Sequence, residues 1–332
     1  MIDISNGRYW DLPWSLVDGC TPCSPGCDHC WSAVIAHRFF REGEPGYCAG
    51  ILTDDKGRFN GDIITHPERL YIPLTRRRPT VYAVWNDLFH EAVSYTFIGR
   101  ALSYAIGEFR HTFLVLTKRP QRMADLMGRF YAECDEKSLR RAINVYCGLT
   151  ICNQEEADEK IPVFLQVPGK KFLSIEPMLG PIDLSGIALK CLESGTDCGG
   201  GMQEKRPGCW KGNCMGNAHV DAVILGGETS PGARPIHPDW ARSVQNQCAA
   251  ANVPFFFKGW GEWLPVYDRD KDDPDFRKCD GVKLITPQGR WLNRAGGQGF
   301  HGARVMRVDR IGKKRAGRLL DGQTYDDLPW NK

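Results

Sequence analysis

Four cysteines, Cys20, Cys23, Cys27 and Cys30, lie within eleven residues near the start of the chain. Two prolines and a glycine between them bend the backbone, so the four thiols can converge on one metal centre. A zinc ion held by four cysteines is one interpretation. However, zinc sites of this kind usually consist of two cysteine pairs separated by a longer segment, and only three residues separate the pairs here. An iron–sulfur cluster is larger and accepts closely spaced thiolates, which favours a cluster in this loop.

The spacing Cys23-x3-Cys27-x2-Cys30 is the signature of radical S-adenosylmethionine (SAM) enzymes, in which three thiolates hold a [4Fe-4S] cluster and leave one iron open. In that chemistry the open iron binds SAM. An electron from the cluster, supplied by an external donor, then splits the sulfonium to yield a 5′-deoxyadenosyl radical. The residue before the last cysteine, often aromatic in these enzymes, is His29. The spacing therefore predicts a [4Fe-4S] cluster and SAM as cofactors.

A second and more widely spaced group of cysteines lies in residues 188–220, a segment rich in glycine and poor in apolar residues. Such a segment is too polar to build its own core, so a bound metal would supply its folding energy. We expect zinc here, with an auxiliary iron–sulfur cluster or four unrelated reduced cysteines as the alternatives. The predicted ligands are Cys191, Cys198, Cys209 and Cys214.

Short runs of β-branched and aromatic residues recur along the chain, separated by stretches long enough for one helix each. They lie at residues 14–17, 81–85, 112–116, 144–148, 172–175, 222–225 and 254–257. Seven strands in βα units predict an α/β fold, a partial or complete (β/α) TIM-like barrel of the radical SAM type. The first run directly precedes the cysteine loop.

The predicted domain organisation has two parts. A barrel domain covers residues 1–262, with an irregular excursion at 41–79 and the Cys-rich metal-binding insertion at 188–220. Residues 263–332 are polar and rich in glycine, which predicts a C-terminal extension laid over the barrel.

Polar residues follow each predicted strand, where the catalytic groups of such barrels lie. We expect Lys118, Glu176 and Lys258 at the barrel mouth, as catalytic residues that orient a substrate or transfer protons. The alternative is a buried ion-pair network that fixes the barrel interior. Asn153 and Gln154 are expected to bind the cofactor's ribose or base, although capping of a loop explains them equally well.

Segments spread over nearly the whole chain resemble the phage Gp37/Gp68 family, also called the DUF5131 or three-Cys-motif family. The resemblance implies a radical-SAM-like protein common in phages and bacteria, with a three-Cys-motif partner protein. Its usual C-x6-C-x2-C pattern maps onto Cys20, Cys27 and Cys30, so Cys23 is an addition and either Cys20 or Cys23 is the third cluster ligand. The matching segments are GCTP at 19–22, SPGCDHC at 24–30, DLFHE at 87–91, LTKRP at 116–120, SIEPMLGPI at 174–182, GGE at 226–228, FFFK at 255–258, GKK at 312–314 and AGRLLDG at 316–322.

Gly226, Gly227 and Glu228 resemble the GGE element that contacts the amino group of SAM in radical SAM enzymes. There the glycines permit close backbone approach and the carboxylate pairs with the ammonium. In this chain the element follows the sixth predicted strand instead of the second, where Asn86 and Asp87 lie. We therefore predict that either Asp87 or Glu228 binds the amino group of SAM.

The net charge of the 332-residue chain, +3, is too small to require a polyanionic partner. Local basic runs at 76–78 and 304–318, with Trp85, Trp260 and Trp263 available for stacking, predict a nucleotide or nucleic-acid substrate. A charged, solvated surface is the alternative. The opening residues lack a secretory signal and no apolar run reaches about 18 residues. We therefore expect a cytoplasmic protein without a membrane partner, in a bacterium or a phage-infected host cell.

Together these observations predict a radical SAM-like enzyme that abstracts hydrogen from a substrate, in modification or repair of a nucleotide or nucleic acid. One alternative is a zinc-containing nucleic-acid-binding module without redox chemistry. The other is a metal-dependent hydrolase with Asp87, Glu176 and Glu228 as the metal ligands.

Overall fold

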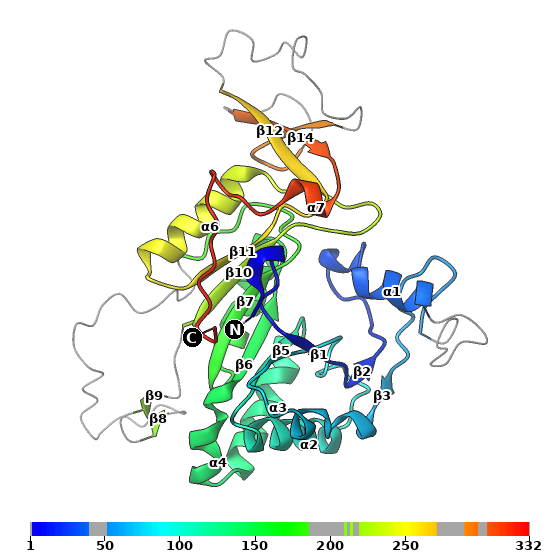
Figure 1. Cartoon of the computed structure of the whole chain (residues 1–332), viewed down its shortest axis with the longest axis vertical. Helices are drawn as coiled ribbons and strands as arrows, with labels where there is room; N and C mark the ends of the chain where they lie inside the picture. The colour runs from blue at the N-terminus through cyan, green and yellow to red at the C-terminus, as the bar shows by residue number, and fades with distance from the viewer. Residues whose placement is uncertain are drawn as a thin grey trace.

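The computed structural model is built around one parallel sheet that curls into a half-barrel (Figure 1). It describes residues 2–39, 52–185, 209–210, 213–214, 219–270, 289–297 and 304–331. The sheet has seven strands, and their spatial order follows the chain, β1-β4-β5-β6-β7-β10-β11. The strands are β1 (Leu12–Trp14), β4 (Val81–Val84), β5 (Thr112–Thr117), β6 (Val145–Thr150), β7 (Lys170–Ile175), β10 (Ala222–Gly226) and β11 (Phe255–Gly259). The expected α/β fold with a partial barrel is confirmed.

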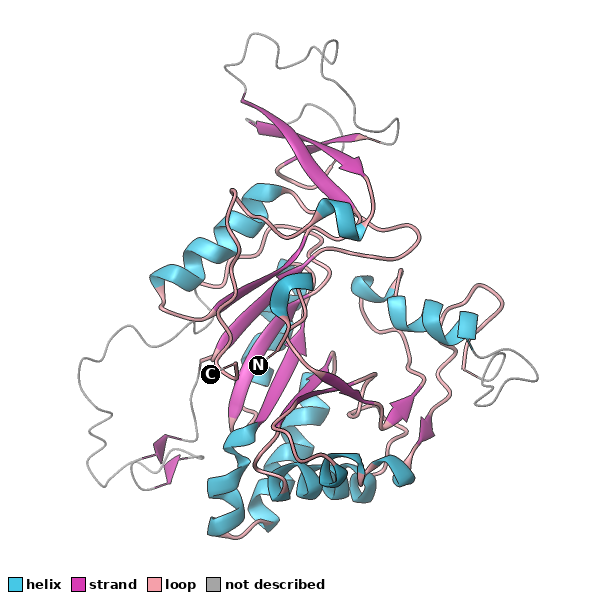
Figure 2. Ribbon diagram, in the orientation of Figure 1, coloured by secondary structure: helices cyan, strands magenta, loops and turns pink. Residues whose placement is uncertain are grey.

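Helices between these strands cover the convex face of the sheet (Figure 2). In α3, Met123, Met127 and Phe130 are buried at a spacing of four and three residues, which places all three on the side that faces the sheet. Outward-pointing strand residues such as Phe113 and Leu173 complete this core. The helices are α2 (Tyr95–Gly107), α3 (Pro120–Glu133), α4 (Glu136–Arg141), α5 (Gln154–Phe164) and α6 (Pro238–Ala250).

The two ends of the chain fill the concave face. Trp330 packs against Tyr146 and Phe172, with ring centroids 4.9 and 5.5 Å apart, and its indole nitrogen donates to the Tyr9 carbonyl at 2.9 Å. Gly148 makes room for this layer, since a β-carbon there would lie 2.3 Å from the ring of Phe172. The amino-end half of the half-barrel is therefore solid, and any chemistry in the barrel belongs at the carboxyl ends of the strands.

The first predicted strand, at residues 14–17, is wrong in its position. β1 ends at Trp14, where the Leu16 amide turns back to donate to the Trp14 carbonyl at 3.0 Å. The next two residues form β2 (Val17–Asp18), which leaves the barrel and pairs antiparallel with β3 (Ile64–Thr65). The cysteine loop thus follows a separate two-stranded ribbon and not a barrel strand.

The C-terminal extension contains a second sheet and then returns to the barrel. Its three antiparallel strands, in the order β12-β14-β13, are β12 (Trp263–Asp270), β13 (Arg290–Asn293) and β14 (Arg304–Arg310). After α7 (Lys313–Ala316) the chain runs back along β11, where the Phe257 amide donates to the Tyr325 carbonyl at 3.0 Å.

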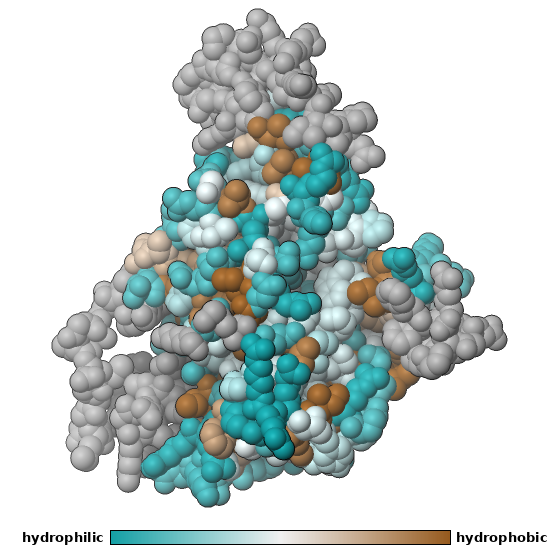
Figure 3. All heavy atoms as spheres, viewed as in Figure 1, coloured by the Kyte–Doolittle hydropathy of each residue, from teal (hydrophilic) through white to brown (hydrophobic). Residues whose placement is uncertain are grey.

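The remaining elements are short. Helix α1 (Trp31–Phe39) directly follows the cysteine loop, and β8 (Cys209–Trp210) pairs with β9 (Asn213–Cys214) inside the Cys-rich segment. The 3₁₀ helices are η1 (Ile4–Asn6), η2 (Pro25–Cys27), η3 (Pro67–Arg69), η4 (Ile72–Thr75) and η5 (Ala142–Asn144). None of the helices in the described ranges has the length and apolar character needed to cross a bilayer. On the face shown in Figure 3, apolar residues form small separate patches among polar ones.

Candidate functional site

The cysteine loop lies across the carboxyl ends of the central strands. Its Thr21 carbonyl accepts from Arg119, which follows β5, and Ser24 lies 3.9 Å from the sulfur of Cys152, which follows β6. Gly26 packs beside Pro177, just after β7, where a β-carbon added to the glycine would lie 3.2 Å from the proline ring. The four thiols are thereby placed at the mouth of the half-barrel, although the loop does not follow a barrel strand.

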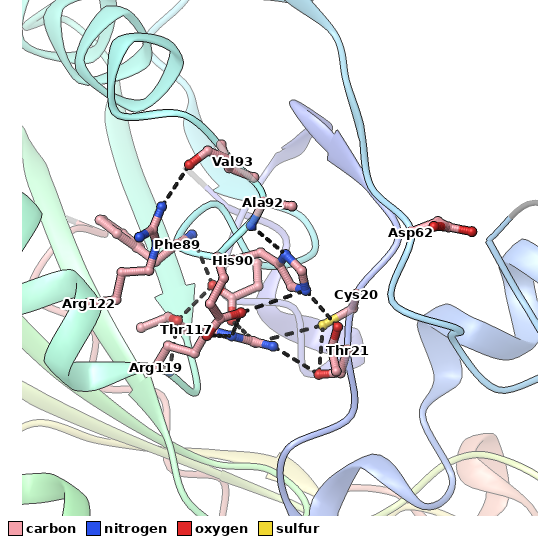
Figure 4. A network of polar contacts seen from close by, with 12 residues as sticks. Cys20, Thr21, Asp62, Phe89, His90, Ala92, Val93, Thr117, Arg119 and Arg122 are labelled. Atoms are coloured by element: carbon pink, nitrogen blue, oxygen red, sulfur yellow. Dashed lines mark hydrogen bonds and ion pairs between the residues drawn. The ribbon is translucent and has the colours of Figure 1, made fainter.

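Arg119 anchors one end of this loop (Figure 4). Its guanidinium donates to the Asp87 carboxylate at 2.7 Å, to Glu91 at 2.8 Å and to the Thr21 carbonyl at 3.0 Å. Asp87 also accepts from the Thr117 hydroxyl at 2.7 Å. The side chains of Arg119 and Asp87 are each only 8% exposed, so this is a buried ion pair. Asp87, predicted to bind the cofactor amine, instead has its carboxylate engaged by Arg119.

His90 provides a second anchor in the same network. Its Nδ1 accepts from the Ala92 amide at 3.1 Å, so in the neutral ring Nε2 carries the proton and donates to the Thr21 hydroxyl at 2.8 Å. Burial lowers the pKa of His90, and the nearby Arg119 guanidinium lowers it further. The ring is therefore neutral at pH 7, with the tautomer that holds Thr21.

Arg234 holds the opposite side of the loop. It reaches from beyond β10 to the Pro25 carbonyl at 2.8 Å and to Asp28 at 3.1 Å, while Glu228 binds it at 2.7 Å. Glu228 is buried, and both of its oxygens accept from Arg234. Glu228, like Asp87, thus pairs with an arginine that holds the cysteine loop.

The two glycines before Glu228 have packing reasons within the fold. A β-carbon on Gly227 would lie 2.1 Å from the Trp260 carbonyl, and one on Gly226 would lie 2.9 Å from a Glu176 carboxylate oxygen. The close approach of Trp260, after β11, and of Glu176, after β7, therefore leaves no room for a side chain at these two positions.

Lys118 and the four cysteines share one electrostatic environment. Burial by itself lowers the pKa of Lys118, but the four sulfurs outweigh burial and raise it, so this lysine remains an ammonium. A hydrogen bond from the Cys23 thiol lowers the pKa of Cys27 to about 5, against burial and with help from Lys118. The pKa of Cys23 is raised, because it keeps the proton that it donates to Cys27. Cys27 is therefore the thiolate of the loop at neutral pH.

Cys20 differs from the other thiols in its surroundings. Burial raises its pKa to about 11, the Asp87 carboxylate adds to that effect, and the Arg119 guanidinium, 4.0 Å away, opposes it. Cys20 and Cys30 also pack against the small apolar cluster beneath α1, whereas Cys23 is exposed. The two candidates for the third ligand thus differ in their surroundings: Cys20 is half-buried beside Arg119, and Cys23 is exposed.

Glu176 meets Lys258 at the mouth, but Lys118 belongs to the cysteine group. The Lys258 ammonium lies 2.8 Å from one Glu176 oxygen, and the Tyr9 hydroxyl donates to the other at 3.1 Å. Ser174 also donates to that second oxygen, at 3.1 Å. Glu176 and Lys258 thus pair with each other, as in the alternative of an ion-pair network, but Lys118 is not part of it. Because the Lys258 side chain is 31% exposed, its ammonium also remains accessible from the mouth.

Asn153 and Gln154 carry structural hydrogen bonds. The Asn153 side chain caps α5 by accepting from the Glu156 amide at 2.9 Å. The Gln154 amide group bonds to the backbone of Asp183 in both directions, at 2.6 and 3.2 Å. Capping, the alternative to cofactor binding at these two positions, is what their contacts show.

The second cysteine group is described only in part. Cys209 and Cys214 are directly opposite each other across the β8–β9 ribbon. Cys191 and Cys198 lie outside the described residues. The predicted second metal site thus stays a prediction.

The ligand set proposed for a metal-dependent hydrolase is not assembled. Asp87 is paired with Arg119, Glu176 with Lys258, and Glu228 with Arg234. Nowhere in the part of the chain that the structure describes do three His, Cys, Asp or Glu side chains converge as ligands for a metal ion.

Two residues of this region were not predicted from the sequence. Arg119 was predicted at the same strand end as Lys118, but without a role of its own. Tyr9 and Arg234 belong to no predicted strand end, and only the fold brings them to the mouth.

Fold and site together define an α/β half-barrel protein with a four-cysteine loop at the carboxyl ends of its parallel strands. The model of a family described as a protein of unknown function, DUF5131, matches residues 5–329. The chain belongs to this DUF5131 family. No curated protein and no solved structure matches the chain significantly.

In the metal-free protein, Cys27 is expected to react with iodoacetamide faster than an ordinary thiol at pH 7. The reactive form is the thiolate, which predominates above the pKa of about 5 and is lost as the pH falls through that value. Alkylation rates at Cys27, followed by mass spectrometry between about pH 4 and 10, check this. Lys118→Met should move the midpoint upward, and a midpoint near the ordinary cysteine value in the native chain would contradict the assignment.

Proposed function

We propose that this protein is a radical SAM-like enzyme that holds a [4Fe-4S] cluster in its cysteine loop. One observation carries the proposal: the loop with the Cys23-x3-Cys27-x2-Cys30 spacing lies across the mouth of a parallel half-barrel, with the Cys27 thiolate beside Lys118. In barrels of parallel strands the carboxyl ends are where the chemistry lies, and the loop reaches them although it does not follow a barrel strand.

The donor types suit a cluster, and the proposal requires the four described thiols, which are not gathered into a ligand group in this structure, to close around it. Cys27 and Cys30, with Cys20 or Cys23, would supply three thiolates, and Cys27 is already deprotonated at neutral pH. Such a cluster would supply one electron, received from an external donor, to SAM, whose sulfonium C–S bond would break into methionine and a 5′-deoxyadenosyl radical. An external electron donor and a three-Cys-motif partner protein are the predicted partners of this reaction.

The residues around the loop have separate tasks in this proposal. Lys118 places a positive charge among the four sulfurs, which stabilises the thiolates. Arg119 and Arg234 hold the two sides of the loop and so keep its cysteines over the strand ends. Lys258 and Glu176 offer one cation and one anion at the mouth, which suits binding of a zwitterionic or phosphorylated ligand.

The filled interior protects such a reaction. Trp330 and Tyr9 close the concave face below the mouth, and the side chains around them are buried. Water is thereby excluded from the amino-end side of the site, as a reactive radical requires.

Anaerobic purification and reconstitution test the proposal directly. We expect about four irons and four sulfides in the loop, absorbance near about 400 nm, and an electron paramagnetic resonance signal of the reduced protein that changes when SAM is added. Zinc alone after reconstitution would support a zinc-containing binding module instead. If a variant without the four loop cysteines still bound iron, the cluster would lie in the second cysteine group instead.

A further inference from the structure

We propose that Trp31, Trp85 and Trp10, with the cations at Arg8, Lys258 and Lys313, bind single-stranded nucleic acid at the barrel mouth. The inference rests on the proposed function in one respect, since it names the substrate class of the same site. Its own support comes from aromatic and charged side chains, of which only Lys258 also has a task in the proposed function.

Three tryptophans form a continuous line that starts at the cysteine loop. Trp31 directly follows Cys30, and its ring meets that of Trp85 edge-to-face with centroids 5.1 Å apart. Trp85 follows β4 and meets Trp10 in the same manner at 6.0 Å. Trp31 is 44% exposed, although tryptophan is usually well buried. Each edge-to-face pair covers a face of only one ring, so the exposed ring of Trp31 offers surface on which an unpaired base stacks.

Cations continue the line beyond the tryptophans. The Arg8 guanidinium lies over the ring of Trp10, 4.6 Å from its centroid, and is exposed. Gly7, the neighbour of Arg8, packs against the Lys258 carbonyl, and α7 with Lys313 is held beside β11 by the bond from the Trp260 amide to the Gly317 carbonyl at 3.1 Å. Burial and the charges of Lys258 and Arg8 lower the pKa of Lys313, while Glu176 and Glu262 oppose them. Glu176 pairs with Lys258 and Glu262 with Arg310, so Arg8 and Lys313 supply the excess positive charge for phosphate groups.

Some residues of the predicted basic runs are exposed near the mouth, and others form ion pairs within the protein. Lys313, Lys314 and Arg315 are exposed on α7, beside the mouth. Arg307, Arg310 and Arg318 of the same run have internal partners, namely Asp309, Glu262 and Asp326. The other run, residues 76–78, precedes β4 at the amino end of the sheet and cannot join this surface.

Two of the tryptophans predicted to stack on bases are excluded. Trp260 is 4% exposed and donates to the Leu319 carbonyl at 2.9 Å, and Trp263 is 3% exposed and donates to the Ala233 carbonyl at 2.7 Å. Both are core residues. Of the three tryptophans predicted to stack on bases, only Trp85 lies at the mouth without being a core residue.

The arrangement favours a single strand over a duplex. Bases in a duplex are stacked on each other, so their faces cannot reach Trp31 and Trp85 without disruption of the helix. A single strand presents its bases freely, and its phosphates can follow the cations from Arg8 to α7.

Fluorescence anisotropy with labelled oligonucleotides of about 12 nucleotides tests the proposal on the full chain. The probes are single-stranded DNA, single-stranded RNA and a DNA duplex of the same length. We expect tighter binding of a single strand than of the duplex. Trp31→Ala should weaken that binding about tenfold. The double variant Arg8→Gln/Lys313→Gln should reduce the salt dependence by about one to two phosphate contacts.

Matched controls lie at the other end of the barrel. Arg77→Gln/Arg78→Gln removes the same charge from exposed residues at the amino end, and Phe109→Ala removes an exposed ring there. Both should bind as the native chain does, and Trp31→Phe should restore most of the binding lost in Trp31→Ala. Equal losses in the controls, or a duplex bound as tightly as single strands, would overturn the proposal.

Iron content, measured in the same preparations, separates this inference from the proposed function. A chain that holds the cluster but binds no oligonucleotide refutes the inference alone. A chain that binds single strands through these residues but takes up no cluster refutes the radical SAM proposal and leaves the nucleic-acid surface standing. A preference between the DNA and RNA probes identifies the natural strand, because only RNA offers the 2′-hydroxyl.

Discussion

Cys27→Ala and Cys30→Ala are each expected to abolish iron binding after anaerobic reconstitution. Both residues belong to both possible ligand sets. Either variant therefore leaves only two thiolates of each set, which is too few to hold a cubane cluster. Iron and sulfide counts, together with the absorbance of the reconstituted protein, measure the loss. Far-ultraviolet circular dichroism should be unchanged, because neither side chain belongs to the main core.

The same series identifies the third ligand. Cys20→Ala and Cys23→Ala should differ, with one retaining iron and the other losing it. Cys134→Ala is the matched control, since Cys134 is a free, half-buried cysteine at the end of α3, near the amino end of the barrel. Full iron content in both the Cys27 and the Cys30 variant would exclude a cluster in this loop.

Arg119→Leu is expected to lower the free energy of unfolding by about 3–5 kcal/mol, because it leaves the buried Asp87 carboxylate without its partner. The change also removes the donor to the Thr21 carbonyl, so the cysteine loop loses one of its two arginine anchors. Urea denaturation measures the destabilisation. Arg119→Lys should recover only part of the lost stability, since one ammonium cannot reproduce the donors that meet Asp87, Glu91 and Thr21.

An exposed ion pair provides the comparison. Arg140 and Glu136 lie 2.7 Å apart on α4 with about three quarters of each side chain exposed, so Arg140→Leu should change the unfolding free energy by less than about 0.5 kcal/mol. The double variant Asp87→Leu/Arg119→Leu should be more stable than Arg119→Leu, because no buried charge is left unpaired. If Arg119→Leu proved as stable as the native chain, the network around Asp87 would not anchor the loop.

The strands of the sheet could be predicted from the local pattern of apolar residues. Six of the seven expected strands are present, because each is a short apolar run whose residues are buried on both faces of a parallel sheet, as at Val223 and Ile224. The first strand was misplaced because Leu16 and Val17 are as apolar as β1 itself, and apolar pattern alone does not show which sheet a strand joins.

In the site, too, features set by local sequence could be predicted, and features set by long-range contacts could not. That four cysteines form one loop follows from the sequence, since their separations are short and the intervening prolines and glycine bend the chain. That Lys118 lies among those sulfurs, and that Arg119 and Arg234 hold the loop from two sides, depends on contacts between segments up to 209 residues apart. Only tertiary packing determines such contacts, because each carboxylate pairs with whichever cation the fold brings within reach. Asp87 and Glu228 therefore have the right chemistry for an ammonium ligand but are paired with arginines in the folded protein.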